Sequence, residues 1–151
     1  MWSRSAFWVL PVWLVACSVD VSASDVSLST RISDESIKVT NGAFSALEGS
    51  FKLELALGSH ANGSTQVALG KFELQTEAGE LLVDLGDAVP EPMFPIDLNE
   101  GESKQVRFDL DGIGVDRASV CAGRVRIVGS VTDTLKGGSD PVRSGAFTPD
   151  C

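Results

Sequence analysis

Apolar and polar residues alternate along much of this chain, and the two-residue period limits the possible folds more than any other feature. In "SFKLELALG", which begins at Ser50, the residues at 51, 53, 55 and 57 are large and apolar. The same alternation recurs at 81–85 and at 106–110. Successive side chains of a β-strand point to opposite faces, so the pattern predicts half-buried strands of an antiparallel sheet. No window shows a convincing helical period, and we therefore expect an all-β protein.

Turn-forming dipeptides divide the chain into short segments. They are Asn41-Gly42, Asn62-Gly63, Ala78-Gly79, Glu100-Gly101 and Gly137-Gly138. Further strand candidates are residues 26–32, 36–40, 94–98, 121–132 and 142–148. About eight short strands with frequent turns predict a single antiparallel β-sandwich over residues 26–151. In "QVALGKFELQT" the apolar phase changes at Gly70, which predicts a β-bulge there.

One stretch resembles a known class of sandwich. "DLNEGESKQVRFDL", residues 97–110, is a polar glycine turn that leads into an alternating strand. It resembles the mid-domain hairpin of bacterial immunoglobulin-like and fibronectin-type modules. The resemblance implies that the sandwich is immunoglobulin-like.

The first part of the chain has the features of an export signal. Residues 1–16 hold an apolar run with one base, Arg4, and no acid. The run is too short to span a bilayer as a helix but suits the core of a secretory signal peptide. It ends in Leu14-Val15-Ala16-Cys17, which resembles the bacterial lipobox.

The lipobox resemblance implies a signal peptide at 1–16, a lipidated Cys17, and an anchor with a short linker at 17–25. The expected partner of the acylated Cys17 is a lipid bilayer. Ser18 resembles the outer-membrane sorting signal of diderm lipoproteins, so the expected location is the outer membrane, on its periplasmic or surface face. The alternative is an ordinary signal peptide that is cut nearby.

The cysteine count agrees with this interpretation. Three cysteines leave one thiol unpaired in a secreted chain, and lipidation of Cys17 leaves Cys121 and Cys151 as a pair. A hairpin centred on Lys136 places these two residues opposite each other and Val125 opposite Phe147. We therefore predict a C-terminal hairpin closed by a Cys121–Cys151 disulfide. The alternative is a reactive or metal-binding pair, which no CxxC spacing or neighbouring histidine supports.

The charge and the aromatic residues make several ligand classes improbable. The chain has 12 Lys and Arg against 21 Asp and Glu, a net charge of −9. Such a chain repels nucleic acid and anionic lipid headgroups. All three Trp lie in the leader and there is no Tyr, so platforms that stack on sugars or bases are not expected.

Few residues suggest catalysis or metal binding. The single histidine, His60, lies in the turn "GSHANGST", where we expect an exposed side chain. "DLDGIGVD" has Asp109, Asp111 and Asp116 like a cation loop, but without the spacing of an EF-hand. Asn62-Gly63-Ser64 matches a glycosylation acceptor, a three-residue pattern that is common by chance. No catalytic residue, metal or cofactor is predicted.

One acidic segment is a candidate contact surface. No base occurs between Lys71 and Lys104, and "VPEPMFPID" inside this segment places Met93 and Phe94 among three prolines. Met93, Phe94, Glu91 and Asp97 are the predicted contacts for a basic protein. The alternative is that the segment crosses between two sheets, with Met93 and Phe94 in the core.

Taken as a whole, the sequence predicts a membrane-anchored exported lipoprotein whose sandwich is a binding or scaffolding module in the cell envelope. Its protein partner is expected to be another envelope protein. A second possibility is an inhibitor or accessory factor of a basic exported enzyme. A third is a hydrolase that uses paired carboxylates.

Overall fold

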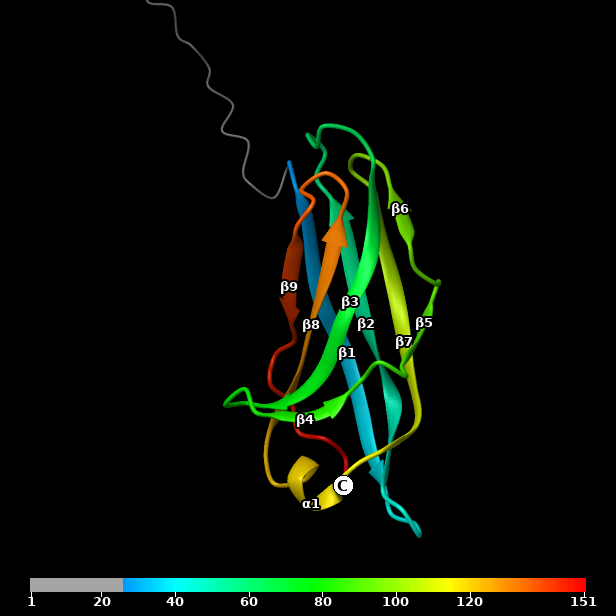
Figure 1. The fold of residues 1–151 in the computed structure, drawn as a ribbon, viewed down its shortest axis with the longest axis vertical. Coiled ribbons are helices and arrows are strands. Elements are labelled where there is room, and N and C mark those ends of the chain that lie inside the picture. Colours follow the sequence, from blue (N-terminus) through cyan, green and yellow to red (C-terminus); the bar gives the residue numbers. More distant parts are fainter. Residues whose placement is uncertain (1–25) are drawn as a thin grey trace, which may run out of the picture.

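Nine strands and one short helix form residues 26–151, the part of the chain that the computed structural model describes (Figure 1). The elements are β1 (Leu28–Thr40), β2 (Ala46–Leu57), β3 (Thr65–Thr76), β4 (Leu81–Asp84), β5 (Val89–Glu91), β6 (Ile96–Leu98), β7 (Ser103–Gly114), α1 (Arg117–Val120), β8 (Val125–Asp133) and β9 (Ser139–Arg143). The all-β prediction is confirmed. The predicted signal peptide, Cys17 and the linker lie outside the described residues.

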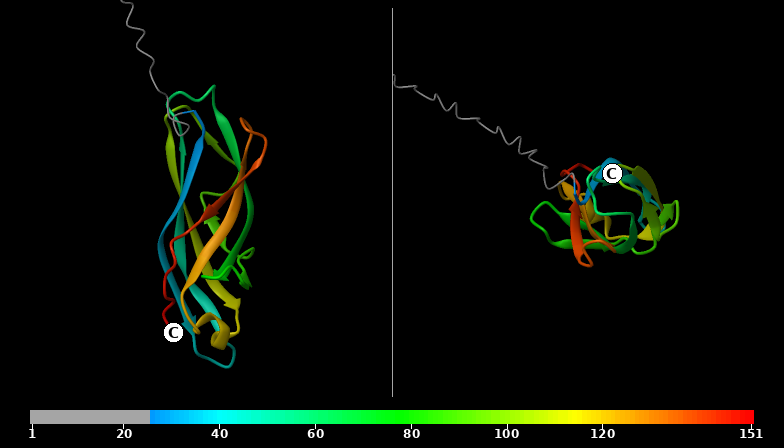
Figure 2. Two further views of the ribbon diagram at one scale, coloured as in Figure 1. Left: turned by 90° about the vertical axis from the view of Figure 1, so that its left-hand side faces the viewer. Right: turned by 90° about the horizontal axis from the view of Figure 1, so that it is seen from above.

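The strands form two antiparallel sheets that pack face to face (Figure 2). The first sheet has the order β1-β2-β7-β5 and the second the order β4-β3-β8-β9, with β6 also paired to β3. The predicted antiparallel sandwich is confirmed. The start of β1 and the C-terminus lie toward opposite ends of this elongated domain (Figure 1).

The core lies between the sheets and follows the alternation in the sequence. The apolar residues of β2 at 51, 53, 55 and 57 are all buried, while the residues between them are partly exposed. Three phenylalanines meet at its centre: Phe51 stacks on Phe108 at 4.6 Å between ring centroids, and Phe72 lies 5.4 Å from Phe108. Phe51 and Phe108 belong to the first sheet and Phe72 to the second, so this cluster joins the two layers.

Two glycines allow β3 and β8 to approach each other closely. The pairing of β3 with β8 shifts between Leu69 and Phe72, which confirms the bulge predicted at Gly70. A Cβ on Gly70 would lie 2.6 Å from the backbone oxygen of Ser130, and a Cβ on Gly129 would lie 2.6 Å from the ring of Phe72. Glycine is therefore required at both positions by space rather than by backbone angle.

The C-terminal hairpin is present, with a difference in register. Cys121 and Cys151 form the predicted disulfide with their Cα atoms 6.1 Å apart, and Val125 bridges Phe147 as predicted. The main ladder, however, pairs Gly129 with Val142, one residue away from the predicted register. The extra residue lies between Ser144, which pairs with Ile127, and Phe147.

The prediction that a strand begins at residue 121 is wrong, because β8 begins at Val125. Before it, Arg117–Val120 form the helix α1, whose N-terminus is capped by the side chain of Asp116. A helix of one turn is too short to leave a helical period in the sequence. The predicted strands 26–32 and 36–40 are one strand, β1, interrupted by a bulge between Ser33 and Ser36. The predicted strand 142–148 corresponds to β9, which begins and ends earlier.

The tail after β9 connects the two sheets. Phe147 pairs with Val125 in the second sheet, and Asp150 then bonds to β1 in the first sheet. Val39 N donates to Asp150 O at 2.7 Å, and Asp150 N donates to Ile37 O at 2.9 Å. The disulfide fixes the next residue, Cys151, to the end of α1.

Replacing Cys121 and Cys151 together by Ser should lower the free energy of unfolding by roughly 3 to 4 kcal/mol. The disulfide closes a loop with a sequence separation of 30, and opening it restores conformational entropy to the unfolded chain. Urea unfolding followed by circular dichroism measures the change. Cys17→Ser is the matched control and should leave the transition unchanged; equal stability of wild type and double mutant would contradict the prediction.

Candidate functional site

The acidic proline-rich segment crosses from one sheet to the other. Its first part, β5, pairs with β7 in the first sheet, and its last part, β6, pairs with β3 in the second. Figure 1 shows both short strands along one side of the sandwich. The crossover interpretation therefore describes the path of this segment.

Within the crossover, Met93 and Phe94 have different environments. Phe94 is half-buried and packs against the core, with its ring centroid 6.3 Å from that of Phe108. Met93 is 69% exposed. Of the two apolar residues proposed as contacts, the fold uses Phe94 for packing and leaves Met93 on the surface.

The acids beside Met93 each interact with a neighbouring side chain. Glu91 is the strand partner of Arg107, whose pKa is raised by Asp109 first and by Glu91 to a smaller extent. Asp97 Oδ1 accepts a hydrogen bond from Gln66 Nε2 at 3.0 Å. Both carboxylates are exposed and could meet a partner, but neither is isolated.

The longer acidic segment does not form one continuous face. Glu77 lies at the β3–β4 turn, 3.6 Å from Arg124, whereas Glu100 and Glu102 lie at the β6–β7 turn near the other end of the domain (Figure 1). The pKa of Glu102 is lowered by the backbone N–H of Asn99 first and then by Lys104. The acids of this segment are therefore separated on the surface, and Glu91 and Asp97 are the two nearest to Met93 in the sequence.

The other residues singled out by the sequence have local structural roles. His60 is exposed in the β2–β3 turn, with Ser59 Oγ 3.2 Å from its Nδ1. Asp109 pairs with Arg107 at 2.7 Å, and Asp116 caps α1. Within residues 26–151, no group of three or more His, Cys, Asp or Glu side chains could hold a metal ion.

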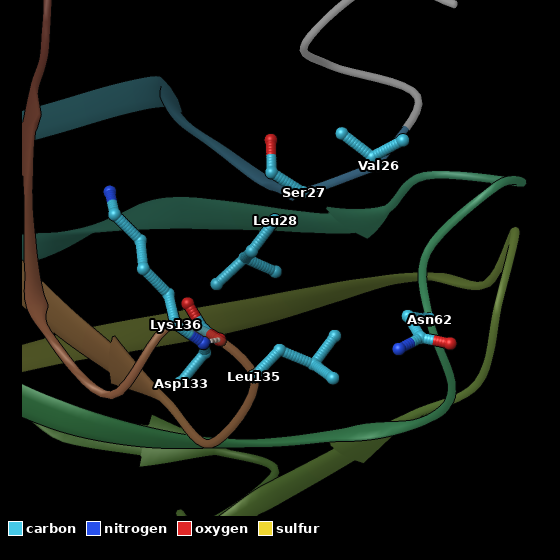
Figure 3. Close-up of a pocket in the computed structure, with 7 residues that line it drawn as sticks. All are labelled: Val26, Ser27, Leu28, Asn62, Asp133, Leu135 and Lys136. Carbon is cyan, nitrogen blue, oxygen red and sulfur yellow. Dashed lines mark hydrogen bonds between the residues drawn. The ribbon is translucent and has the colours of Figure 1, made fainter.

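A small cavity opens at the end of the sandwich where the described chain begins (Figure 3). It measures about 310 Å³, and Leu28 and Leu135 enter it from β1 and from the β8–β9 turn. Its buried carboxylate, Asp133, accepts a hydrogen bond from Lys136 N at 2.8 Å and so holds that turn. The carboxylate therefore stabilises the turn.

A second cavity, which the sequence did not predict, lies beside the bulge of β1. We call it the bulge cleft. It has a volume of about 430 Å³ and is lined by residues 31–35 of β1 and by residues 143 and 145–147. The signal in the sequence is "SDES", residues 33–36, which interrupts the apolar period of β1 and predicts a gap between two strands. The structure shows a bulge instead, with Asp34 at a φ of 54°. Non-glycine residues seldom adopt this left-handed conformation.

The bulge cleft contains two consecutive carboxylates, Asp34 and Glu35. Asp34 Oδ2 lies 2.7 Å from Lys52 Nζ, and this contact is the first cause that lowers the pKa of Asp34. An acid-base hydrolase needs one protonated carboxyl beside an ionised one. Asp34 is held in its ionised form, so it does not suit the role of proton donor.

No protein-family model, curated protein or solved structure matches this sequence. Within the described residues, no helix is long and apolar enough to cross a membrane.

Phe94→Ala should lower the free energy of unfolding by about 2 kcal/mol, because it removes a ring packed on Phe108 from a partly buried position. Met93→Ala, its exposed neighbour, is the matched control and should change stability by less than about 0.5 kcal/mol. Urea unfolding of both variants measures the difference. Two equal, small effects would mean that Phe94 does not support the core.

Proposed function

We propose that this protein is an exported lipoprotein whose acylated Cys17 holds an immunoglobulin-like binding or scaffolding module in the cell envelope. The lipobox resemblance of Leu14-Val15-Ala16-Cys17 supports the anchor, and Ser18 supports the outer membrane of a diderm cell. One acylated cysteine carries several chains, and more than one chain gives stable attachment.

The strand order is the observation that carries the immunoglobulin-like part of the proposal. An immunoglobulin-type sandwich has the order A-B-E-D in one sheet and C-F-G in the other, and C′ joins the second sheet in variable-type domains. If the strands are lettered in chain order and β6 is left out, the orders β1-β2-β7-β5 and β4-β3-β8-β9 correspond to A-B-E-D and C′-C-F-G. The strand β6, which pairs with β3, has no counterpart in this scheme. The step from this fold to a binding role is an analogy between folds.

An anchor at Cys17 would also orient the domain. Residues 17–25 span at most about 30 Å when fully extended, so Val26 would stay close to the bilayer. The opposite end of the sandwich carries α1 and the β1–β2 turn, in which Phe44 is 90% exposed. In this orientation that end points away from the membrane.

Met93 favours a second candidate function, an inhibitor or accessory factor of a basic exported enzyme. An exposed methionine between Glu91 and Asp97 offers an adaptable apolar contact with acids on both sides. The acids would attract a basic partner through electrostatic forces whose range becomes shorter as the salt concentration rises. Met93 would contribute only once the two surfaces are in contact.

Cys17→Ser should move the protein from the membrane fraction to the soluble fraction without changing its unfolding transition. The cysteine is needed only as the site of acylation, and the domain lies after it. Fractionation of expressing cells together with labelling by radioactive palmitate tests this. If the wild-type chain takes up no palmitate, the anchor proposal fails.

For the second candidate, crosslinking in the native envelope should capture a basic protein with wild type and capture clearly less of it with Met93→Ala. Raising the salt concentration should weaken capture, because exposed charges are screened beyond about 8 Å at physiological ionic strength. Leu81→Ala, which also removes an exposed apolar side chain, is the matched control on β4. Equal capture by wild type and both variants would exclude the crossover as the contact surface.

A further inference from the structure

The bulge cleft is an opening in one side of the sandwich. β1 and β9 are the edge strands of their sheets on this side, and they do not pair with each other. After β9, the chain next pairs with β1 at the Lys38–Asp150 bridge. Between these points the cleft exposes the outer edge of β1, with Ile32 and Phe147 among its lining residues.

Two guanidinium groups line the cleft: Arg31, which lies opposite Glu54 on β2, and Arg143, which has no carboxylate partner among the described residues. Among the described residues, neither Arg31 nor Arg143 has an ion pair or a side-chain hydrogen bond. In contrast, Arg107 and Arg124 on other surfaces each have a carboxylate within 4 Å. A guanidinium has five N–H donors in a fixed planar arrangement that suits a carboxylate.

The charges around the cleft favour an anionic ligand. Lys52 bonds Asp34 and Arg31 lies opposite Glu54, so Arg143 is the base of the cleft that is left without a carboxylate partner within residues 26–151. Arg143 can therefore receive an anionic group, although the chain as a whole has a net charge of −9. Its volume of about 430 Å³ lies within the ordinary range for ligand pockets.

The backbone of β1 limits the shape of the ligand. Apart from the Lys38–Asp150 bridge, no described residue pairs with the outer edge of β1. An exposed strand edge binds extended peptides through backbone hydrogen bonds, and neighbouring pockets select their side chains. The bulge at residues 33–36 turns this edge at the position where the cleft lies.

We propose that the bulge cleft binds a short extended peptide segment of a partner protein and that Arg31 and Arg143 hold a carboxylate of that peptide. This inference rests on the proposed binding role of the domain and gives it a site. It does not depend on the lipid anchor, so Cys17→Ser should bind the peptide as wild type does.

The experiment is an NMR titration of the ¹⁵N-labelled full chain, kept in solution with a mild detergent, with three tetrapeptides. One has an internal Glu and an amidated end, one has a free C-terminal carboxylate and no acidic side chain, and one has Gln and an amidated end. At least one acidic peptide should shift the amides of residues 31–35 and 143–147 in a saturable way. The first two peptides distinguish a side-chain carboxylate from a chain terminus.

Arg143→Gln should weaken the binding about tenfold or more, because it removes a charge-assisted hydrogen bond from the ligand. Arg107→Gln, an exposed arginine on β7, is the matched control and should leave binding unchanged. Arg31→Gln replaces Arg143→Gln if the latter alters amides throughout the spectrum. The proposal is overturned if the neutral peptide binds equally well, if both cleft variants bind as wild type does, or if no shift saturates at millimolar peptide.

Discussion

The stacking of Phe51, Phe72 and Phe108 is the contact on which the rest of the domain depends. It joins the two sheets at the centre of the core. Gly129 leaves room for the ring of Phe72, and the shift at Gly70 keeps both Phe72 and Val67 buried although they differ in phase. Phe94, in the crossover between the sheets, adds a fourth ring to this cluster. The crossover segment therefore contributes to the packing of the core.

The edge strands show how the fold limits unwanted strand pairing, since an open edge can pair with another chain. β5 and β9 contain proline, and β4 is only four residues long. β1, with 13 residues, is the long edge, and it is covered near its end by Asp150 and distorted by the bulge at Asp34. The short uncovered portion of β1 is the place where the cleft opens, so the least protected edge lies beside Arg143, which has no carboxylate partner in the described part of the chain.

Charge is distributed by the fold in a way that the linear sequence does not reveal. The acidic segment is continuous along the chain, but its members are separated on the surface and partly paired with bases from other strands, such as Arg107 and Arg124. Arg31 and Arg143 are far apart in sequence and line the same cleft, where Arg31 lies opposite Glu54 and Arg143 has no acidic partner among the described residues. Which charged side chains have a partner therefore depends on the pairing between strands, not on local composition.

By itself, the sequence determined the all-β class, the sandwich and the bulge at Gly70, because a two-residue period and turn dipeptides depend on local geometry. It indicated the Cys121–Cys151 pair through the cysteine count and the hairpin that brings the two residues together. For Met93 and Phe94 it left two interpretations, contacts for a partner protein or core residues of a crossover between the sheets. Only the tertiary structure decided that Phe94 packs inward, that "SDES" is a bulge inside one strand, and that the main C-terminal ladder is shifted by one residue. These outcomes depend on which strands become neighbours and how much space remains between them, and both are set by long-range packing that no local pattern encodes.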